Sequence, residues 1–324
     1  MSDERDKAVK FLTLPDADYA DLKGNRLTEF QSKFGGLFDS DDLDAPPGGT
    51  ALLAIGAPKR ADFDSGKEIP ILVGLRTTGL RRWEVDPRQN ALLIGVDLRS
   101  GAVYSGWPLV NDKRRRTPDP SRTGEPPQEE DATVLTTSVQ NVDLRKGLEG
   151  KWGATRLALT AVIYDWVSNT VTIDLTKKGQ EPAALAPRSE SALLSRSKPG
   201  GEVPKLDGPG AVLQVPTNVD PGDPAFLGGA VDLPASEVVT VPSSAPEGGS
   251  LLAVSVVFRK LDDPQTLQAD LLVPAQVADG RVRAWFEFDA RRVNPEEHLS
   301  GVFQVYLVTG TRLVGPFVMK VEVR

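Results

Sequence analysis

The sequence of 324 residues contains no cysteine. This absence excludes disulfide bonds, thiolate metal sites, iron–sulfur clusters and cysteine nucleophiles, because each of them requires a sulfhydryl group. A chain without cysteine is compatible with the reducing cytoplasm, which we take as its predicted location. A secreted bacterial protein whose signal has been removed is the alternative.

Histidine is almost as scarce, because His298 is the only one in the chain. A Ser–His–Asp triad would have to use this residue, and zinc sites built on histidine need two or three such ligands. His298 lies in the segment NPEEHLSG, whose turn residues predict an exposed loop. The sequence therefore nominates no catalytic residue, no metal site and no cofactor, and it favours a protein that is not an enzyme.

Long apolar runs are also missing. No window holds about 18 uncharged apolar residues, so we expect no membrane-spanning helix. The first residues, MSDERDKAVKFLTLPD, have no apolar stretch after a basic start, so no secretory signal is visible. The chain carries 38 Lys and Arg against 45 Asp and Glu, a net charge of −7. This acidic balance argues against a nucleic-acid binder, because phosphate binding relies on clustered cations.

What the sequence does contain is a series of short, β-branched apolar segments separated by turn residues, with 30 glycines and 26 prolines. No amphipathic helix of 10 to 15 residues lies between them, which disfavours a parallel α/β sheet. We predict an all-β protein with two antiparallel β-sandwich domains. The first seven segments are TALLAIGAP, IPILVGLRT, NALLIGVDLRS, AVYSGWPLV, ATVLTTSVQNVDL, TRLALTAVIYDWV and TVTIDL. The second seven are FLGGAVDLP, SEVVTVP, SLLAVSVVFRK, LQADLLVP, RVRAWFEFDA, GVFQVYLVTG and RLVGPFVMKVEVR.

Composition divides the chain into four parts. Residues 1–49 form a predicted N-terminal tail, and residues 50–178 form the first sandwich, which carries a long loop at 111–131. A Pro/Gly-rich linker is predicted at 179–225, where AVLQVP has the pattern of an edge strand, and the second sandwich covers 226–324. Within the first sandwich, ALTAVIYDWVSNTVTIDL predicts a hairpin with residues 168–170 at its tip.

The second sandwich resembles immunoglobulin-like and fibronectin-type domains in strand number and length. HLSGVFQVYLV is similar to the strand in which such domains place a corner tyrosine. Here Phe303 stands at that place, so the hydroxyl bond of the tyrosine is missing, as is the Cys–Trp–Cys framework. The resemblance implies an architecture and carries no function.

The stretch 111–131, NDKRRRTPDPSRTGEPPQEED, is the most conspicuous candidate site. Lys113, Arg114, Arg115 and Arg116 suggest a nucleic-acid contact, but six acids outnumber the five cations of the stretch, and it has no aromatic residue for base stacking. Its four prolines oppose both helix and sheet. We interpret the stretch as a surface loop or as an arm that docks on a protein, with Trp107 close by as a further contact residue.

Five tryptophans offer a different possibility, a platform on which sugars stack. Trp166 and Trp285 lie inside apolar segments, which predicts a place in the core. Trp107 and Trp152 lie near turns and are the better candidates for exposure.

These observations lead to a ranked set of hypotheses for the function. The first is a non-catalytic accessory or assembly subunit that binds another protein or forms a homo-oligomer, without nucleic acid and without a membrane span. The second is a carbohydrate- or ligand-binding module, or a hydrolase that uses paired carboxylates. The third is a structural component of a secretion or phage-like assembly.

Overall fold

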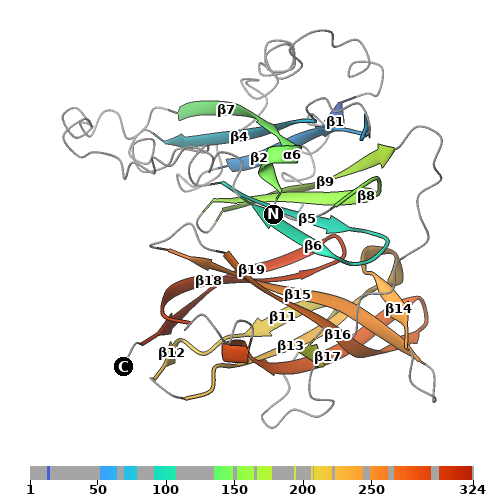
Figure 1. Cartoon of the computed structure of the whole chain (residues 1–324), viewed down its shortest axis with the longest axis vertical. Coiled ribbons are helices and arrows are strands. Elements are labelled where there is room, and N and C mark those ends of the chain that lie inside the picture. Colours follow the sequence, from blue (N-terminus) through green and yellow to red (C-terminus); the bar gives the residue numbers. More distant parts are fainter. Residues whose placement is uncertain are drawn as a thin grey trace. The chain divides into compact units, whose positions relative to one another are not determined.

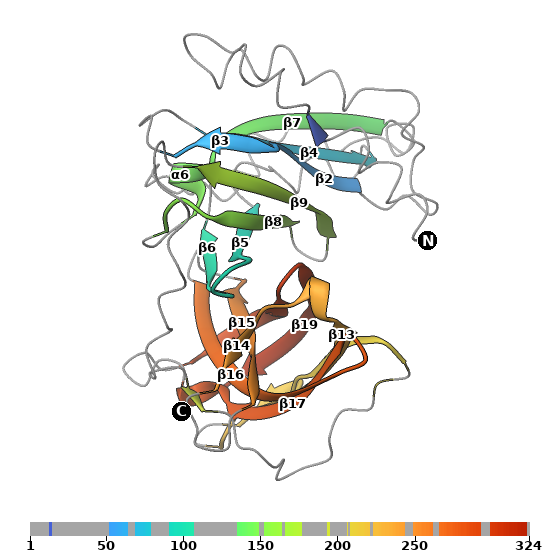
Figure 2. The same cartoon turned by 90° about the vertical axis from the view of Figure 1, so that its right-hand side faces the viewer.

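The computed structural model of the chain is almost entirely β, which confirms the predicted all-β class (Figures 1 and 2). In the part of the chain that is described, helical turns are confined to α6 (Leu144–Gly147), η3 (Ala235–Glu237) and η4 (Ala290–Arg292). The structure describes residues 13–14, 52–63, 69–78, 91–106, 135–148, 152–163, 166–176, 193–194, 206, 208–220, 223–243, 249–261, 266–292 and 299–322.

The chain divides into two compact units. The first comprises Met1–Gly95 and Tyr104–Pro182, and the second comprises Val96–Val103 and Ala183–Arg324. All fourteen segments predicted as strands contain a strand, whereas the domain boundaries drawn from composition stay a prediction. Three short strands, β10, β11 and β12, lie within the stretch predicted as a linker.

The first unit consists of two sheets. One has the order β1-β2-β4-β7 and the other β3-β9-β8-β5-β6, and their outermost strands β1 and β3 pair in parallel with β2 and β9. The first sheet contains β1 (Thr13–Leu14), β2 (Leu52–Pro58), β4 (Pro70–Thr78) and β7 (Leu135–Asp143). The second contains β3 (Arg60–Asp62), β5 (Leu92–Asp97), β6 (Val103–Gly106), β8 (Arg156–Ile163) and β9 (Trp166–Thr176).

Both sheets of the first unit contribute to one hydrophobic core. Ile55 of β2, Ile71 of β4, Leu159 of β8 and Ile173 of β9 are fully buried members of it. At about 25 cal/mol per Å² of apolar surface removed from water, such side chains supply most of the free energy that holds the sheets together. The half-buried ring of Trp166 packs against this core.

A hydrogen-bonded amide also links the two sheets. The side-chain oxygen of Asn169 in β9 accepts from the Ile55 N–H at 2.9 Å, and its nitrogen donates to the Ile55 carbonyl at 2.9 Å. The polar residues 168–170 are therefore not the tip of the hairpin, and that prediction was wrong. β8 and β9 pair as far as Ile163 and Trp166, and Ser168 instead accepts the Ala161 N–H where the register shifts.

The second unit contains a larger, mostly antiparallel sheet. Its order is β11-β13-β17-β16-β15-β18-β19-β12, with β10 paired to β16 and β14 to β15. The strands are β10 (Leu193–Leu194), β11 (Gly210–Gln214), β12 (Asn218–Val219), β13 (Phe226–Pro234), β14 (Thr240–Pro242), β15 (Ser250–Lys260), β16 (Thr266–Ala278), β17 (Arg281–Asp289), β18 (Gly301–Thr309) and β19 (Arg312–Val321). AVLQVP thus does provide an edge strand, β11, which pairs with β13.

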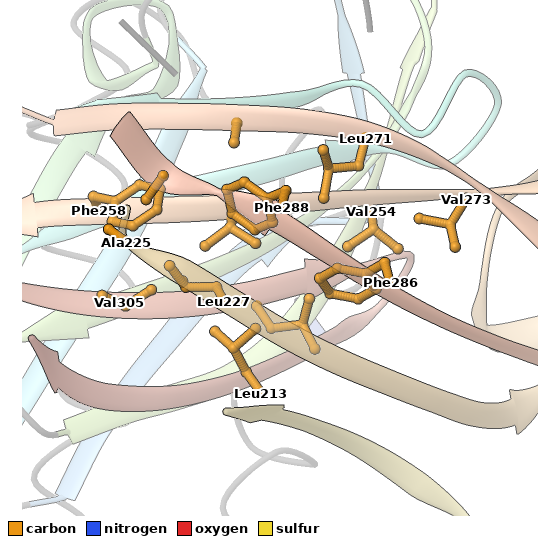
Figure 3. Close-up of a cluster of buried hydrophobic side chains, with 14 of the residues drawn as sticks. Leu213, Ala225, Leu227, Val254, Phe258, Leu271, Val273, Phe286, Phe288 and Val305 are labelled. Carbon is orange, nitrogen blue, oxygen red and sulfur yellow. The ribbon is translucent and has the colours of Figure 1, made fainter. Parts of the chain in front are cut away.

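The core of the second unit lies between β11–β13–β17 on one side and β15–β18–β19 on the other (Figure 3). Leu227, Phe286 and Phe258 point into it, and Phe303 is buried in the same cluster. Because side chains alternate along a strand, Trp285 points away from Phe286 and stays half-buried outside this cluster. The predicted core position of Trp285 was therefore wrong.

Strand β15 is buried on both of its faces, which explains why most of its residues are apolar. Val254 and Phe258 face the core, whereas Ser255 and Arg259 are buried on the opposite face. Side chains on that face form hydrogen bonds to neighbouring strands, and the Ser255 hydroxyl donates to Asp270. Arg259 donates in the same way to the Gln304 side chain at 3.4 Å.

The first prediction concerns Gly229 of β13, where an added Cβ would overlap the ring of Phe286. Gly229→Ala should lower the free energy of unfolding of the second unit by about 1–3 kcal/mol, because the ring has to leave its packed position. Gly210→Ala is the matched control, since an added Cβ there meets nothing within 4 Å. Calorimetric melting of the full chain measures both, and an equal loss in the two variants would contradict the packing described here.

The second prediction concerns the amide link of Asn169. Asn169→Ala leaves the N–H and carbonyl of the fully buried Ile55 without this partner, so we expect a loss of about 1–3 kcal/mol for each group. Thr172→Ala, a half-buried polar residue of the same strand, should change the stability by about 0.5 kcal/mol or less. Urea unfolding measures the two changes, and similar values would show that the amide link is unimportant.

Candidate functional site

The residues predicted to contact a partner, Trp107, Lys113, Arg114, Arg115 and Arg116, lie outside the described residues. The same holds for His298. The loop 111–131 therefore stays a prediction. Among the residues that the structure does describe, two exposed surfaces have the composition of a binding site, one in each unit.

The first surface lies at one end of the first unit, where β3 lies beside α6 (Figure 2), and it includes five basic residues of the described ranges. Arg60 and Arg156 both stand opposite Asp174 on neighbouring strands, and Arg145 of α6 reaches the residue that follows β3. We call this group the basic corner, and its members are Lys59, Arg60, Arg145, Lys146 and Arg156. All except the half-buried Arg145 are exposed.

Arg145 is held in place by contacts on both sides. The buried Asp143 caps α6 by accepting the Arg145 N–H at 3.1 Å, and the same carboxylate oxygen accepts the Ile69 N–H at 3.1 Å. The guanidinium lies 4.6 Å from the centre of the Phe63 ring and donates to the Phe63 carbonyl. A cation over an aromatic face is attracted by the ring quadrupole, so this arginine is preorganised.

Trp152 completes the aromatic part of the corner. Its ring centre lies 5.5 Å from that of Phe63, and its Nε1–H donates to the Leu148 carbonyl at 3.3 Å. Both rings are half-buried and pack against the core. A sugar platform needs an open ring face, so the burial of Trp152 against its own fold counts against that use.

Within the described ranges, the cations of the basic corner outnumber the acids beside them. Asp174 forms an ion pair with Arg156, with 3.5 Å between Nε and Oδ1, and the two side chains are 44% and 61% exposed. Asp62 is exposed beside them, and Asp143 is buried beneath. Among the described residues, five cations therefore lie beside three acids, Asp62, Asp143 and Asp174.

The second surface is the outer face of β13 and β17 in the second unit, which consists of the side chains that point away from the core. Phe226 is 40% exposed there, and Trp285 stands opposite Ala230 in the register. The face also carries Asp232, Arg281 and Arg283.

Asp232 lies between two arginines on this face. Arg281 Nε lies 2.7 Å from one carboxylate oxygen, and Arg283 Nε lies 3.3 Å from the other. The hydrogen bond from Arg281 is the main reason that the pKa of Asp232 lies below its ordinary value, and Arg283 lowers the pKa further. The carboxylate is 23% exposed, so this group of charges is in part open to solvent.

Neither surface was predicted from the sequence, although the sequence does contain a signal for the outer face of β13 and β17. In RVRAWFEFD, residues Arg281, Arg283, Trp285 and Glu287 share one parity of the strand and so share a face. The basic corner has no such local signal, because its members come from three separate segments of the chain.

Within the described ranges, no group of three His, Cys, Asp or Glu side chains is placed to hold a metal ion. No helix in those ranges is long and apolar enough to cross a bilayer.

No protein-family model matches the chain, and no curated protein sequence does so. Among solved structures, it is similar to a red sea bream transglutaminase, with 11% identity, a TM-score of 0.19, and coverage of 91% of this chain and 34% of that one. The ICAM-5 D1–D4 ectodomain fragment gives 12% identity, a TM-score of 0.19, and coverage of 84% and 53%. A Mobiluncus mulieris adhesin gives 12% identity, a TM-score of 0.14, and coverage of 81% of this chain and 83% of that one.

The chain thus spans about a third of the transglutaminase and about half of the ICAM-5 fragment. All three TM-scores lie far below 0.5, so these likenesses carry no argument about the fold or the function of this chain.

The third prediction follows from the lowered pKa of Asp232. Because this pKa is lower in the folded than in the unfolded state, the ion pairs stabilise the second unit above about pH 4, and this stabilisation is lost as the pH falls through the folded pKa. Asp232→Asn should make the acid loss of thermal stability shallower. Melting curves between pH 7 and pH 2.5 measure it, and identical acid profiles for wild type and variant would contradict the assignment.

Proposed function

We propose that this chain is a non-catalytic, protein-binding subunit of a larger assembly, built from two β-sandwich domains of which the second is immunoglobulin-like. The observation that carries the proposal is the outer face of β13 and β17. Tryptophan, arginine and exposed phenylalanine are the residue types that contribute most to binding at protein interfaces, and Trp285, Arg281, Arg283 and Phe226 share this face.

The strand order supports the immunoglobulin-like part of the proposal. β11 pairs with β13, and a few residues later β12 pairs in parallel with β19, so the chain changes from one side of the core to the other. The long β16 pairs with β15 along most of its length and with β17 at its end, which joins the two sides. Two sheets joined in this way around one core are typical of such sandwiches.

A carbohydrate- or ligand-binding module, or a hydrolase with paired carboxylates, is the second candidate function. It requires a cleft with at least two open aromatic rings beside acids. Trp152 is packed against the core and donates its indole N–H to Leu148, so it does not favour this candidate. Trp107, the other ring on which the candidate depends, lies outside the described residues.

A structural component of a secretion or phage-like assembly is the third candidate. It differs from the first by requiring a closed or open symmetric array of this chain itself. The molar mass in solution separates the two, because an accessory subunit that binds a different protein has no need to form such an array when purified alone.

The fourth prediction tests the outer face in the native host. Tagged full-length chain is purified in parallel with Phe226→Ser and Leu261→Ser, two variants whose parent side chains are both 40% exposed. We expect Phe226→Ser to reduce the recovery of at least one partner about tenfold, as the loss of an aromatic hot spot does, while Leu261→Ser leaves recovery unchanged. Quantitative mass spectrometry of the co-purified proteins measures this, and melting curves confirm that each variant is folded.

A third arm of the same experiment deletes residues 111–131 and tests the predicted docking loop separately. Loss of a different partner on deletion would assign that loop its own contact. If wild type co-purifies with no protein above a tag-only control, or if the two serine variants lose partners equally, the proposed function is wrong.

A further inference from the structure

The outer face of β13 and β17 has an order of charges that is complementary to itself. Along β17, Arg281 and Arg283 come first, Trp285 lies in the middle, and Glu287 and Asp289 come last. The five side chains share one parity of the strand and so lie on one face of it. A strand with cations at one end and acids at the other attracts a second copy of itself that runs in the opposite direction.

The register of the strands places an apolar row at the centre of this order. Val212 of β11 stands opposite Ala230 of β13, which in turn stands opposite Trp285 of β17. Ala230 is buried, and the other two side chains are half-buried. Protein interfaces place aromatic and apolar residues at the centre and charged residues at the rim. The outer face has this arrangement about a single row.

The rows on the two sides of Trp285 differ in charge. On one side, Arg283 of β17 stands opposite Asp232 of β13. On the other side, Glu287 stands opposite Gly228. A two-fold axis that crosses the strands through the apolar row brings each flanking row against the other row of the second copy. Arg283 then faces the second copy's Glu287, and Gly228, which has no side chain, leaves room for Asp232.

This pairing allows each charged group to keep the contacts that it has in the single chain. Arg283 is 55% exposed while its Nε lies 3.3 Å from Asp232, and a guanidinium has about five N–H donors. A carboxylate offers about four lone-pair sites, so Glu287 can accept a further arginine beside its present contact. The parallel arrangement of two β17 strands is disfavoured, because it places Arg283 against the same residue of the other copy.

The size of the face limits the strength of the contact. The nine residues of β17 span about 30 Å, and the three strands β11, β13 and β17 are together about 14 Å wide. The projected area is therefore about 400 Å² for each copy, compared with roughly 800 Å² per partner in a standard interface. A contact of this size is reversible, so the association should depend on concentration.

We propose that two copies of the chain associate through the outer face of β13 and β17 in an antiparallel, two-fold symmetric dimer. This inference rests on the proposed function, because it names a second copy as the protein that the face binds. The same axis brings the exposed Phe226 of one copy against Pro234 of the other, which adds an apolar contact at each end. A two-fold contact closes after two copies, so it forms no extended array.

The fifth prediction uses sedimentation velocity of the purified full chain between about 1 and 200 μM. Wild type should change from monomer to dimer as the concentration rises. Arg283→Glu and Glu287→Arg each place like charges against each other on both sides of the axis. Each substitution should therefore raise the dissociation constant at least about tenfold. Melting curves confirm that both variants are folded.

A mixture of the two variants restores the opposite charges. In a dimer of one Arg283→Glu chain and one Glu287→Arg chain, both charge pairs are attractive with their signs exchanged. The equimolar mixture should therefore dimerise about as tightly as wild type. Both variants keep a net negative charge, since each substitution changes the −7 of the chain by two, so overall charge does not favour their association.

Arg312→Glu is the matched control for the loss of an exposed arginine. Arg312 is 54% exposed and also pairs with an acid, Glu237, in the same unit. Because it lies on β19 and outside the outer face of β13 and β17, its substitution should leave the dissociation constant of the dimer unchanged.

Three outcomes would overturn the inference. These are a wild type that stays monomeric over this range, a mixture that associates no better than either variant alone, and an Arg312→Glu chain that weakens the dimer as much as Arg283→Glu does. If wild type is monomeric while Phe226→Ser still loses a native partner, a different protein occupies the face and the proposed function stands. If the dimer forms but the tagged chain recovers no protein other than itself, the larger assembly is wrong and this inference stands.

Discussion

The alternation of side chains along β13 and β17 is the constraint on which the account of the second unit depends. One parity places Leu227 and Phe286 in the core, and the other places Phe226 and Trp285 on the outer face. A shift of the register by one residue would exchange the two sets, so burial of the core also fixes which residues lie on the outer face. In the proposed function, stability and recognition are thus encoded in the same strands by neighbouring residues.

The first unit follows a different principle, because its exposed site is assembled from distant segments. A shared hydrophobic core joins its two sheets, and the side-chain amide of Asn169 links β9 to β2. Asp143 is the N-cap of α6 and orients this helix. These contacts bring Arg145 beside Phe63 and so place a helix residue next to the edge strand β3. The basic corner is consequently a product of tertiary structure.

The strands were predictable from the sequence because their apolar and β-branched residues repeat with the correct period, as in SLLAVSVVFRK, which forms β15 at its predicted bounds. The tip of the β8–β9 hairpin was misplaced because Ser168 and Asn169 look like turn residues, and only the fold reveals their bonds to Ala161 and Ile55. Trp285 was predicted to lie in the core because its neighbours in the sequence are apolar. Alternate residues of RVRAWFEFD share one face of the strand, however, and this alternation places Trp285 on the same face as the two arginines. The basic corner lay beyond prediction, since no local pattern brings residues 59 and 145 together.

The most direct test of the account compares two adjacent residues of β13. Leu227→Ala removes a fully buried core side chain and should lower the free energy of unfolding by about 2–5 kcal/mol. Phe226→Ala removes a larger side chain, but one that is 40% exposed on the outer face and leaves no closed cavity, so it should cost less. Equal losses, or a greater loss for Phe226→Ala, would contradict the separation of a core face from a contact face.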